Sequence, residues 1–447
     1  MANTEKMLLG YSSRCITPKE NVPLGGYGNS NFRISTEVLD DIYTAAIAIS
    51  DGDNTVILIQ NDLQAAVRRV LEAVRKEVSR CTGVPFENIM ASVEHVHSAP
   101  DLWNYDYPTI ERYEPELVQT MVENAVAAWE DRKPVTVTAG QAEVKDLGFV
   151  RHYITESGHV RGPNFGLQYD SPKVAHTHEP DRMMQVVRFA REGADDVVLV
   201  NWQSHPQKAT GDHYYSITAD TIGVMRKYVE ANTGCKFIYA LGASGDVQIS
   251  SLIKEENVYP DYVSCGEVLG KTAVKILEEN MEPLALGPVK VQENIFTATI
   301  DKSELYKLEA AEAIVEQWSK DNDFKAAVKA GEPHGINSPY HARAIIMRSE
   351  RPDTKPVELY AFKVGQLGFV FCPYEMFTQH GAYIKANSPC KHTIVFSMTN
   401  DTNHYIPTKA GFDYNCYEAN TCLLPRGIGE TFADEFVNML KKMGERT

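Results

Sequence analysis

Two histidines two positions apart could bind a metal ion. They are His95 and His97 of HVHSAP at residues 95–100, at the end of the apolar segment NIMASVEHV. Side chains at i and i+2 of a strand lie on one face, so we expect both imidazoles to point the same way. Imidazole nitrogen is a common zinc ligand, although two hydrogen-bonded histidines without a metal would give the same pattern.

A third histidine ends a second apolar segment. His205 closes VVLVNWQSH, and Pro206 follows it directly. A single histidine at a strand end is more often structural than catalytic. The same placement on two separate strands nevertheless favours a shared metal site at the strand ends, where catalytic groups commonly lie.

Two oxygen-bearing side chains near the C-terminus follow apolar segments as well. Glu375 lies in FVFCPYEMF, and Tyr405 follows TIVFSMTND. A buried carboxylate is costly unless it pairs with a cation, so Glu375 could bind a metal or an arginine equally well. A tyrosine ligand must be a phenolate, and the free pKa is about 10, so the residue types alone do not select Tyr405.

Three other motifs give weaker signals. GASGDV at residues 242–247 has Asp246 where the nucleophile elbow G-x-S-x-G needs glycine, so Ser244 is not expected to be a nucleophile. GGYG at residues 25–28 lacks the strand and lysine of a phosphate-binding loop. His176 and His178 lie in a polar segment beside Asp181, where we expect them to be solvated or behind the site.

Strands and helices that could position these residues alternate along the chain. Apolar periodicity and turn residues predict strands that include a hairpin around residues 50–55 and another with its turn at Gly365. The predicted strands cover residues 43–50, 55–62, 88–96, 133–144, 183–190, 195–205, 236–244, 290–300, 357–373 and 393–401. The predicted helices cover residues 63–80, 115–132, 217–234, 268–281, 303–330 and 432–443. The mixture predicts an α/β fold with mixed β-sheets flanked by helices.

Several segments of the chain have no such periodicity or carry mostly charge. We expect the charged helical segment 303–330 to be a solvated peripheral element, and the polar stretch 337–356 to be a long surface excursion. No repeat and no linker is evident, so residues 1–447 are predicted to form one catalytic domain.

Composition excludes several classes of partner. The 447 residues carry a formal net charge of -16, which disfavours nucleic acid and anionic membrane surfaces as partners. No segment approaches the ~20 apolar residues of a membrane span, and residues 1–14 lack a signal-peptide core. The eight cysteines are scattered without a C-x-x-C pair, which predicts reduced thiols in a cytoplasmic protein. A homo-oligomer remains open.

Six segments, taken together and in order, resemble the neutral/alkaline, non-lysosomal ceramidase family. They are ITP…VPLGGYG at 16–28, HVHSAP at 95–100, NWQSHP at 201–206, GDV at 245–247, CPYEMFT at 372–378 and HYIPT…YEA at 404–419. The resemblance implies an α/β catalytic domain with two β-sheets flanked by helices. It also implies one Zn²⁺ per chain.

The same resemblance implies roles for individual residues. The zinc ligands would be His95, His205, Glu375 and Tyr405. The catalytic and substrate-contacting residues would be His97, Arg151 and Tyr417.

Two features depart from the family pattern. Gln248 stands where the family has a serine that touches the zinc-bound water, and glutamine can hydrogen-bond a water but cannot relay a proton. The chain also ends soon after the last motif, without the immunoglobulin-like C-terminal domain of the family. Both features make a membrane sphingolipid an improbable substrate.

We therefore expect a zinc-dependent hydrolase that cleaves a C–N amide bond, or an ester or lactam, of a small soluble molecule. One alternative is a phosphate or sulfate ester hydrolase with a second metal at His176, His178 and Asp181, since two-metal sites suit that chemistry. Another alternative is a non-catalytic zinc- or ligand-binding protein, which the replacement of the family serine by Gln248 would fit.

Overall fold

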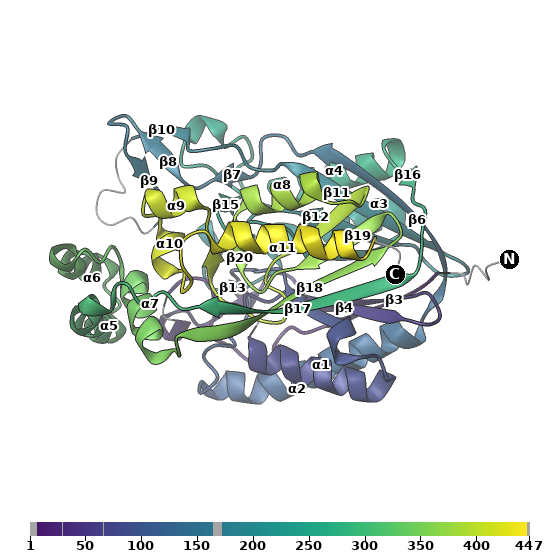
Figure 1. The fold of residues 1–447 in the computed structure, drawn as a ribbon, viewed down its shortest axis with the longest axis horizontal. Coiled ribbons are helices and arrows are strands. Elements are labelled where there is room, and N and C mark those ends of the chain that lie inside the picture. The colour runs from purple at the N-terminus through teal and green to yellow at the C-terminus, as the bar shows by residue number, and fades with distance from the viewer. Residues whose placement is uncertain (1–6, 29, 66, 164–171, 445–447) are drawn as a thin grey trace.

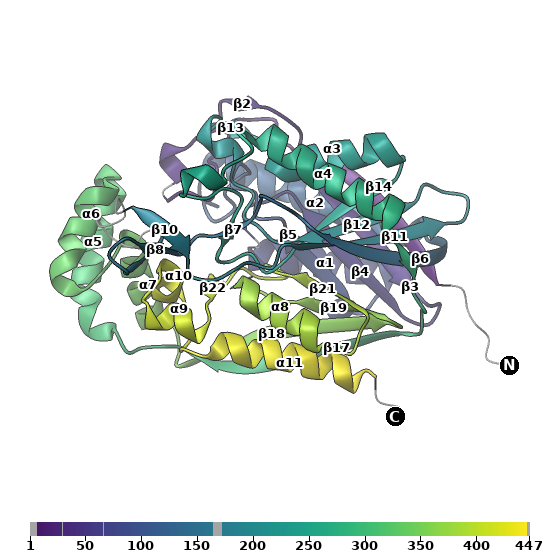
Figure 2. The ribbon, with the colours of Figure 1, turned by 90° about the horizontal axis from the view of Figure 1, so that it is seen from above.

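Four layers of helices and sheets make up the main body of the molecule (Figures 1 and 2). The computed structural model describes residues 7–28, 30–65, 67–163 and 172–444. A nine-stranded sheet and a four-stranded sheet lie face to face in the middle, and helices cover the outer face of each. The predicted α/β class with mixed sheets flanked by helices is confirmed.

The larger sheet is mixed. Its strand order is β14-β12-β11-β6-β1-β3-β4-β5, with β16 beside β6. The pairs β12/β14 and β4/β5 are parallel, and the other neighbours are antiparallel. The strands are β1 (Leu8–Cys15), β3 (Tyr43–Ser50), β4 (Thr55–Asn61), β5 (Ile89–Val93), β6 (Lys133–Glu143), β11 (Met183–Arg191), β12 (Val197–Trp202), β14 (Lys236–Leu241) and β16 (Glu282–Pro283).

The smaller sheet packs against the larger one through aromatic and aliphatic side chains. Its order is β17 (Val289–Thr299), β18 (Thr354–Val364), β19 (Leu367–Phe371) and β21 (His392–Phe396), and only β19/β21 is parallel. The hairpin predicted at Gly365 is the β18–β19 connection, and Gly365 has φ +59°. That conformation favours glycine because it has no Cβ.

Helices on the outer faces complete the layers. α1 (Arg68–Thr82), α2 (Pro108–Glu130), α3 (Asp220–Thr233) and α4 (Tyr262–Glu279) cover the larger sheet. α8 (Thr378–Asn387) and α11 (Ile428–Lys442) cover the smaller one. Figure 2 shows α3 and α4 on one side of the molecule and α11 on the other. None of the helices in the described ranges is long and apolar enough to cross a bilayer.

A small helical group projects from one end of the layers (Figure 1). It consists of α5 (Leu308–Asp321), α6 (Phe324–Gly331) and α7 (Pro339–Glu350), which share an apolar cluster around Trp318. The predicted helix over 303–330 is therefore two helices with a buried face. The expectation of a surface excursion at 337–356 is wrong, because α7 occupies most of it.

The remaining helices and strands are short and lie near the ends of the large strands. They include β7 (Phe149–Val150), β15 (Val247–Gln248), β20 (Glu375–Met376), β22 (Tyr405–Ile406), α9 (Lys409–Asp413) and α10 (Tyr417–Thr421). β20 and β22 form a separate parallel pair, and β15 pairs with β7. These short elements carry four of the residues that the sequence analysis selected, namely Gln248, Glu375, Tyr405 and Tyr417.

Backbone and side-chain contacts join the two sheets beyond the carboxyl ends of their parallel strands. Ser397, just after β21, donates its N–H to the carbonyl of Leu241 at the end of β14. Asn400 imitates a strand partner for Ala91 in β5: its Oδ1 accepts the Ala91 N–H at 2.9 Å and its own N–H donates to the Ala91 carbonyl at 2.7 Å. The ends of β5, β12, β14, β19 and β21 are thereby gathered at one edge, where α/β proteins bind ligands.

The packing between the sheets should dominate stability. Phe369 is fully buried there, and its ring is stacked on Phe362 with centroids 4.0 Å apart. Phe369→Ala should lower the free energy of unfolding by about 3–5 kcal/mol, because it removes buried apolar area and leaves a cavity. Urea unfolding followed by fluorescence tests this. Ile295→Ala on the exposed side of β17 is the control, and an equal loss in both variants would contradict this account of the core.

Candidate metal centre

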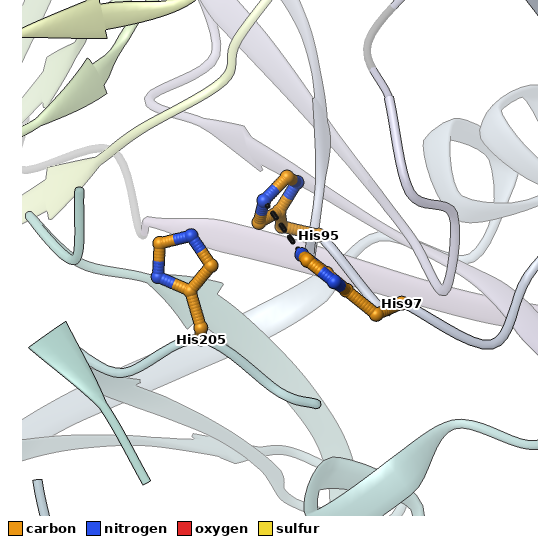
Figure 3. A group of neighbouring side chains, drawn as sticks. All are labelled: His95, His97 and His205. Carbon is orange, nitrogen blue, oxygen red and sulfur yellow. Dashed lines mark hydrogen bonds between the residues drawn. The ribbon is translucent and has the colours of Figure 1, made fainter. Parts of the chain in front are cut away.

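Three histidine side chains from two parts of the chain meet beyond the ends of β5 and β12 (Figure 3). The Nε2 atoms of His95 and His97 are 3.1 Å apart. The ring centroids of His95 and His205 are 4.9 Å apart, and those of His97 and His205 are 5.6 Å apart. All three side chains are almost fully buried. Their arrangement could hold a metal ion.

The two histidines of HVHSAP converge for a reason other than strand alternation. β5 ends at Val93, so His95 and His97 lie in the following loop. His95 has φ +61°, a left-handed conformation that is strained for a residue with a side chain. This turn, and not the pleat of a strand, brings the His95 and His97 rings together, with an interplanar angle of 90°.

Backbone carbonyls fix which ring nitrogen carries the proton. His95 Nδ1 lies 2.7 Å from the carbonyl of Gln64, and His205 Nδ1 lies 2.9 Å from the carbonyls of Ser244 and Val247. A carbonyl only accepts hydrogen bonds, so both Nδ1 atoms must carry hydrogen. In the neutral rings the lone pair is therefore on Nε2, which is the arrangement found in metal-ligating histidines.

Both of these lone pairs face one carboxylate oxygen. Glu375 Oε2 lies 3.3 Å from His95 Nε2 and 3.1 Å from His205 Nε2. A carboxylate and two unprotonated nitrogens all accept hydrogen bonds, so a cation between them would relieve their repulsion. His97 adds a buried Nδ1 that has no hydrogen-bond partner among the described residues. Two imidazoles and one carboxylate are a ligand set that suits zinc.

The electrostatics of the group favour neutral rings at His97 and His205 and a charged carboxylate at Glu375. Burial lowers the pKa of His97, and the neighbouring His95 and His205 lower it further. Burial and then Arg151 lower the pKa of His205. Burial alone would raise the pKa of Glu375, but His95 and His205 hold it well below its ordinary value. The low pKa values of His97 and His205 favour the unprotonated rings that a metal requires.

Tyr405 lies next to Glu375 because of a short parallel pairing. Glu375 in β20 and Tyr405 in β22 are register partners, and the Tyr405 side chain is almost fully buried. Burial, with Glu375 adding to it, raises the pKa of Tyr405 well above its ordinary value. Ligation through the phenolate would therefore require a metal to displace the proton.

The glycine-rich turn at residues 25–28 covers His97. Gly26 has φ +100°, and a Cβ on it would lie 2.6 Å from His97 Cγ, so only glycine fits. The Tyr27 ring packs edge-on against the His97 ring with centroids 5.0 Å apart. Arg33 holds the turn down by donating Nη1–H to the carbonyls of Gly25 and His97.

Arg151 directly follows β7 and reaches the histidines, where several contacts hold it. Its Nε donates to Glu418 Oε1 at 2.7 Å, and its Nη2 donates to the Gly245 carbonyl at 2.8 Å. Its Nη1 lies 3.5 Å from His205 Nε2, and the guanidinium carbon is 5.3 Å from the centre of the Tyr405 ring. One edge of the guanidinium is thus anchored, and the other faces the candidate metal centre.

A second group of potential metal ligands lies behind Arg151. It consists of His152, Cys416 and Glu418, all buried. Glu418 Oε2 accepts from His152 Nε2 at 2.8 Å, and His152 Nδ1 lies 3.1 Å from the Tyr414 hydroxyl. Burial alone would raise the pKa of Glu418, but His152 and Arg151 hold it at about 2. The guanidinium of Arg151 already supplies the cation that these residues would otherwise need.

The other selected residues lie at different distances from the histidines. The Tyr417 ring lies 5.5 Å from the Tyr405 ring, which places it beside the candidate centre. Gln248 forms a backbone bridge with His205, but its side-chain amide donates to the Tyr153 hydroxyl at 3.0 Å.

The proposed second metal ligands are directed to separate partners. His176 pairs with Glu256, His178 with Asp246, and Asp181 with Lys385. These three side chains do not form a metal-ligating group in the described structure.

Several neighbours of the site were not selected from the sequence. The sequence analysis tested the GGYG turn at residues 25–28 only as a phosphate-binding loop. Three glycines within four residues also indicate a backbone that packs closely against a neighbouring group. Glu418 and His152 each adjoin a selected residue, Tyr417 and Arg151. Their partnership spans 266 residues, so no local pattern could have revealed it.

The fold of the chain is similar to that of known structures. No protein-family profile and no curated protein sequence matches it. Among solved structures, the fold is that of neutral ceramidase.

Two of those structures can be compared in detail. The neutral ceramidase from Pseudomonas aeruginosa superposes with a TM-score of 0.72 at 16% identity, over 98% of this chain and 74% of that one. A ceramidase complexed with C2 superposes with a TM-score of 0.71 at 15% identity, over 99% of this chain and 76% of that one. The resemblance read from six short motifs is confirmed at the level of fold.

The Arg151–Glu418 pair should be a strong determinant of stability. Glu418→Gln keeps the size of the side chain but leaves the Arg151 charge buried without a counter-ion, so unfolding should become easier by about 3 kcal/mol. Denaturant unfolding measures the difference. The control is Glu20→Gln, which breaks an exposed carboxylate–arginine pair with Arg112. If Glu418→Gln were no more destabilising than Glu20→Gln, Arg151 would not depend on Glu418.

Proposed function

We propose that this protein is a zinc-dependent hydrolase that cleaves a C–N amide bond of a small soluble substrate. The observation that carries the proposal is the meeting of two imidazole lone pairs, His95 Nε2 and His205 Nε2, on one carboxylate oxygen of Glu375. Backbone carbonyls enforce this arrangement, which a cation would stabilise. The ceramidase-like fold supports amide hydrolysis as the reaction.

The proposed ligands are His95, His205, Glu375 and Tyr405. Zinc bound there would act as a Lewis acid on a substrate carbonyl and would activate a water as the nucleophile. Three or four protein ligands leave room for these small molecules, which is typical of catalytic and not of structural zinc sites. The same open position argues against the purely ligand-binding alternative.

The remaining residues of the site would bind and orient the substrate. His97 lies 3.1 Å from His95, with its ring held by Tyr27 and Gly26, and could donate a hydrogen bond to the oxyanion that develops on the carbonyl oxygen. Arg151 directs Nη1 toward the same place and would fix the orientation of the carbonyl group. Tyr417 would contact the substrate beside Tyr405.

One zinc per chain distinguishes this proposal from a two-metal ester hydrolase. A single metal is supported by the separate partners of His176, His178 and Asp181. It is also supported by Arg151, whose guanidinium already pairs with Glu418 beside His152. A two-metal mechanism would require a second set of carboxylates within reach of the first metal.

Metal analysis tests the ligand assignment. Protein purified without a histidine tag and dialysed against zinc should contain about one zinc per chain, and Glu375→Gln should lose most of it because the only carboxylate of the set becomes neutral. Glu256→Gln is a matched control, since Glu256 pairs with His176 outside the candidate centre. Full zinc content in Glu375→Gln would remove Glu375 from the ligand set.

Activity measurements separate His97 from the ligands. His97→Ala should retain zinc but hydrolyse small N-acyl amides about 100- to 1000-fold more slowly, the usual effect of losing one oxyanion donor. His95→Ala should lose both zinc and activity. Loss of zinc from His97→Ala would instead make His97 a ligand. Hydrolysis of phosphate or sulfate esters, but of no amide, by the wild type would contradict the proposed reaction.

A further inference from the structure

A cation with no anionic partner among the described residues lies in the helical group at the end of the molecule. Arg343, in α7, is partly buried, and its guanidinium carbon lies 4.3 Å from the centre of the Trp318 ring. Within the described part of the chain it has no ion-pair or hydrogen-bond partner. Burial lowers the pKa of Arg343, and Tyr340 and Asp101 offset part of this effect. An unpaired, partly desolvated charge is costly, which calls for an anion.

The carboxylate that acts on the charge of Arg343, Asp101, already accepts hydrogen bonds from other groups. Asp101 Oδ1 accepts the backbone N–H of Trp103 at 3.0 Å, and its carboxylate also accepts a hydrogen bond from Ser30. Burial raises the pKa of Asp101 despite these bonds and despite Arg343. Asp101 influences the pKa of Arg343 through its charge but forms no ion pair with it. By contrast, Arg348 on the same helix binds Glu304 Oε2 at 2.9 Å.

A series of aromatic contacts connects Arg343 to the candidate metal centre. The ring centroids of Tyr405 and Tyr417 are 5.5 Å apart, those of Tyr417 and Tyr340 are 5.8 Å apart, and those of Tyr340 and Trp318 are 5.3 Å apart. Tyr340 and Arg343 are one turn apart on α7, so they lie on the same face of that helix.

The glycine-rich turn at residues 25–28 packs against two members of this aromatic series, Tyr340 and Trp318. A Cβ on Gly28 would lie 3.1 Å from the Tyr340 hydroxyl and 3.4 Å from the Trp318 ring. The turn that covers His97 therefore also contacts the aromatic residues that lead to Arg343. The α5–α7 group is thus built into the surroundings of the metal centre, although the sequence suggested a solvated element.

We propose that Arg343 binds an oxyanion, such as a carboxylate, at the far end of the substrate, while the scissile amide lies at the metal centre. The inference rests on the proposed function and specifies its substrate class as anionic N-acyl compounds. The tyrosine rings between the two ends would contact the acyl or spacer atoms, since tyrosine offers apolar area together with a hydroxyl. A guanidinium binds a carboxylate through two parallel N–H groups, which gives orientation as well as affinity.

Linear hydroxamic acids test the inference without requiring turnover. A hydroxamate at one end binds a zinc ion, and the other end carries either a carboxylate or, in the matched compound, a primary carboxamide. Calorimetric titration of the zinc-loaded protein with a series of increasing chain length should show one length at which the carboxylate binds roughly 10- to 100-fold more tightly than the carboxamide. Arg343→Met should abolish this preference and leave the affinity for the carboxamide unchanged.

Arg343→Met keeps an apolar stem against Trp318, so it removes the charge and not the packing. Arg14→Met is the control for a general charge effect, because it removes a positive charge paired with Glu123 on the exterior and should leave the preference intact. Equal binding of both compounds to the wild type, or a preference that survives Arg343→Met, would overturn the role of Arg343 while the metal site stands. Failure of every hydroxamate to bind would overturn the metal site and this inference together.

Discussion

The candidate site depends on the hydrogen bonds that hold the Nδ1–H groups of His95 and His205 against backbone carbonyls. These carbonyls only accept hydrogen bonds, so Nδ1 of each ring must keep its hydrogen. A second hydrogen on Nε2 would make the ring a cation, and burial opposes that charge on His205. Both Nε2 lone pairs are therefore directed at Glu375 in the folded chain. An arrangement that is repulsive by itself becomes favourable when a cation is bound, so part of the binding energy for a metal is built in during folding.

The two sheets supply the rigidity that this arrangement requires. His95, His205 and the Gly245 carbonyl follow strands of the larger sheet, whereas Glu375 follows a strand of the smaller one. Contacts such as Asn400 to Ala91 fix the two edges to each other. Non-glycine residues with positive φ gather at this edge, namely His95, Met398, Asn400 and His404. Such strain persists only where the surrounding packing over-determines the backbone, and it is commonly found at functional sites.

Sequence patterns were sufficient for most of the long strands and for their carboxyl ends, although β1 in the middle of the larger sheet was not predicted. The apolar segments before His95, His205 and Glu375 are β5, β12 and β19, because buried strands must be apolar on both faces. α7 was not predicted because its buried face includes polar residues. His341 and Arg348 are buried there, and both bind the carboxylate of Glu304. Glu304 is 37 residues from His341 and 44 from Arg348, so a local sequence window cannot detect this partner.

Arg151 and Arg343 show how one residue type serves two electrostatic purposes. Arg151 is balanced by Glu418, and His152 in turn fixes that carboxylate, so Arg151 presents oriented N–H groups to the candidate metal centre with little net charge. Arg343 has no such partner among the described residues, and its charge is still available to an anion. Discrimination by charge would therefore arise away from the reacting atoms. At the candidate metal centre, a second positive charge would compete with a bound metal, and the charge of Arg151 is already balanced by Glu418.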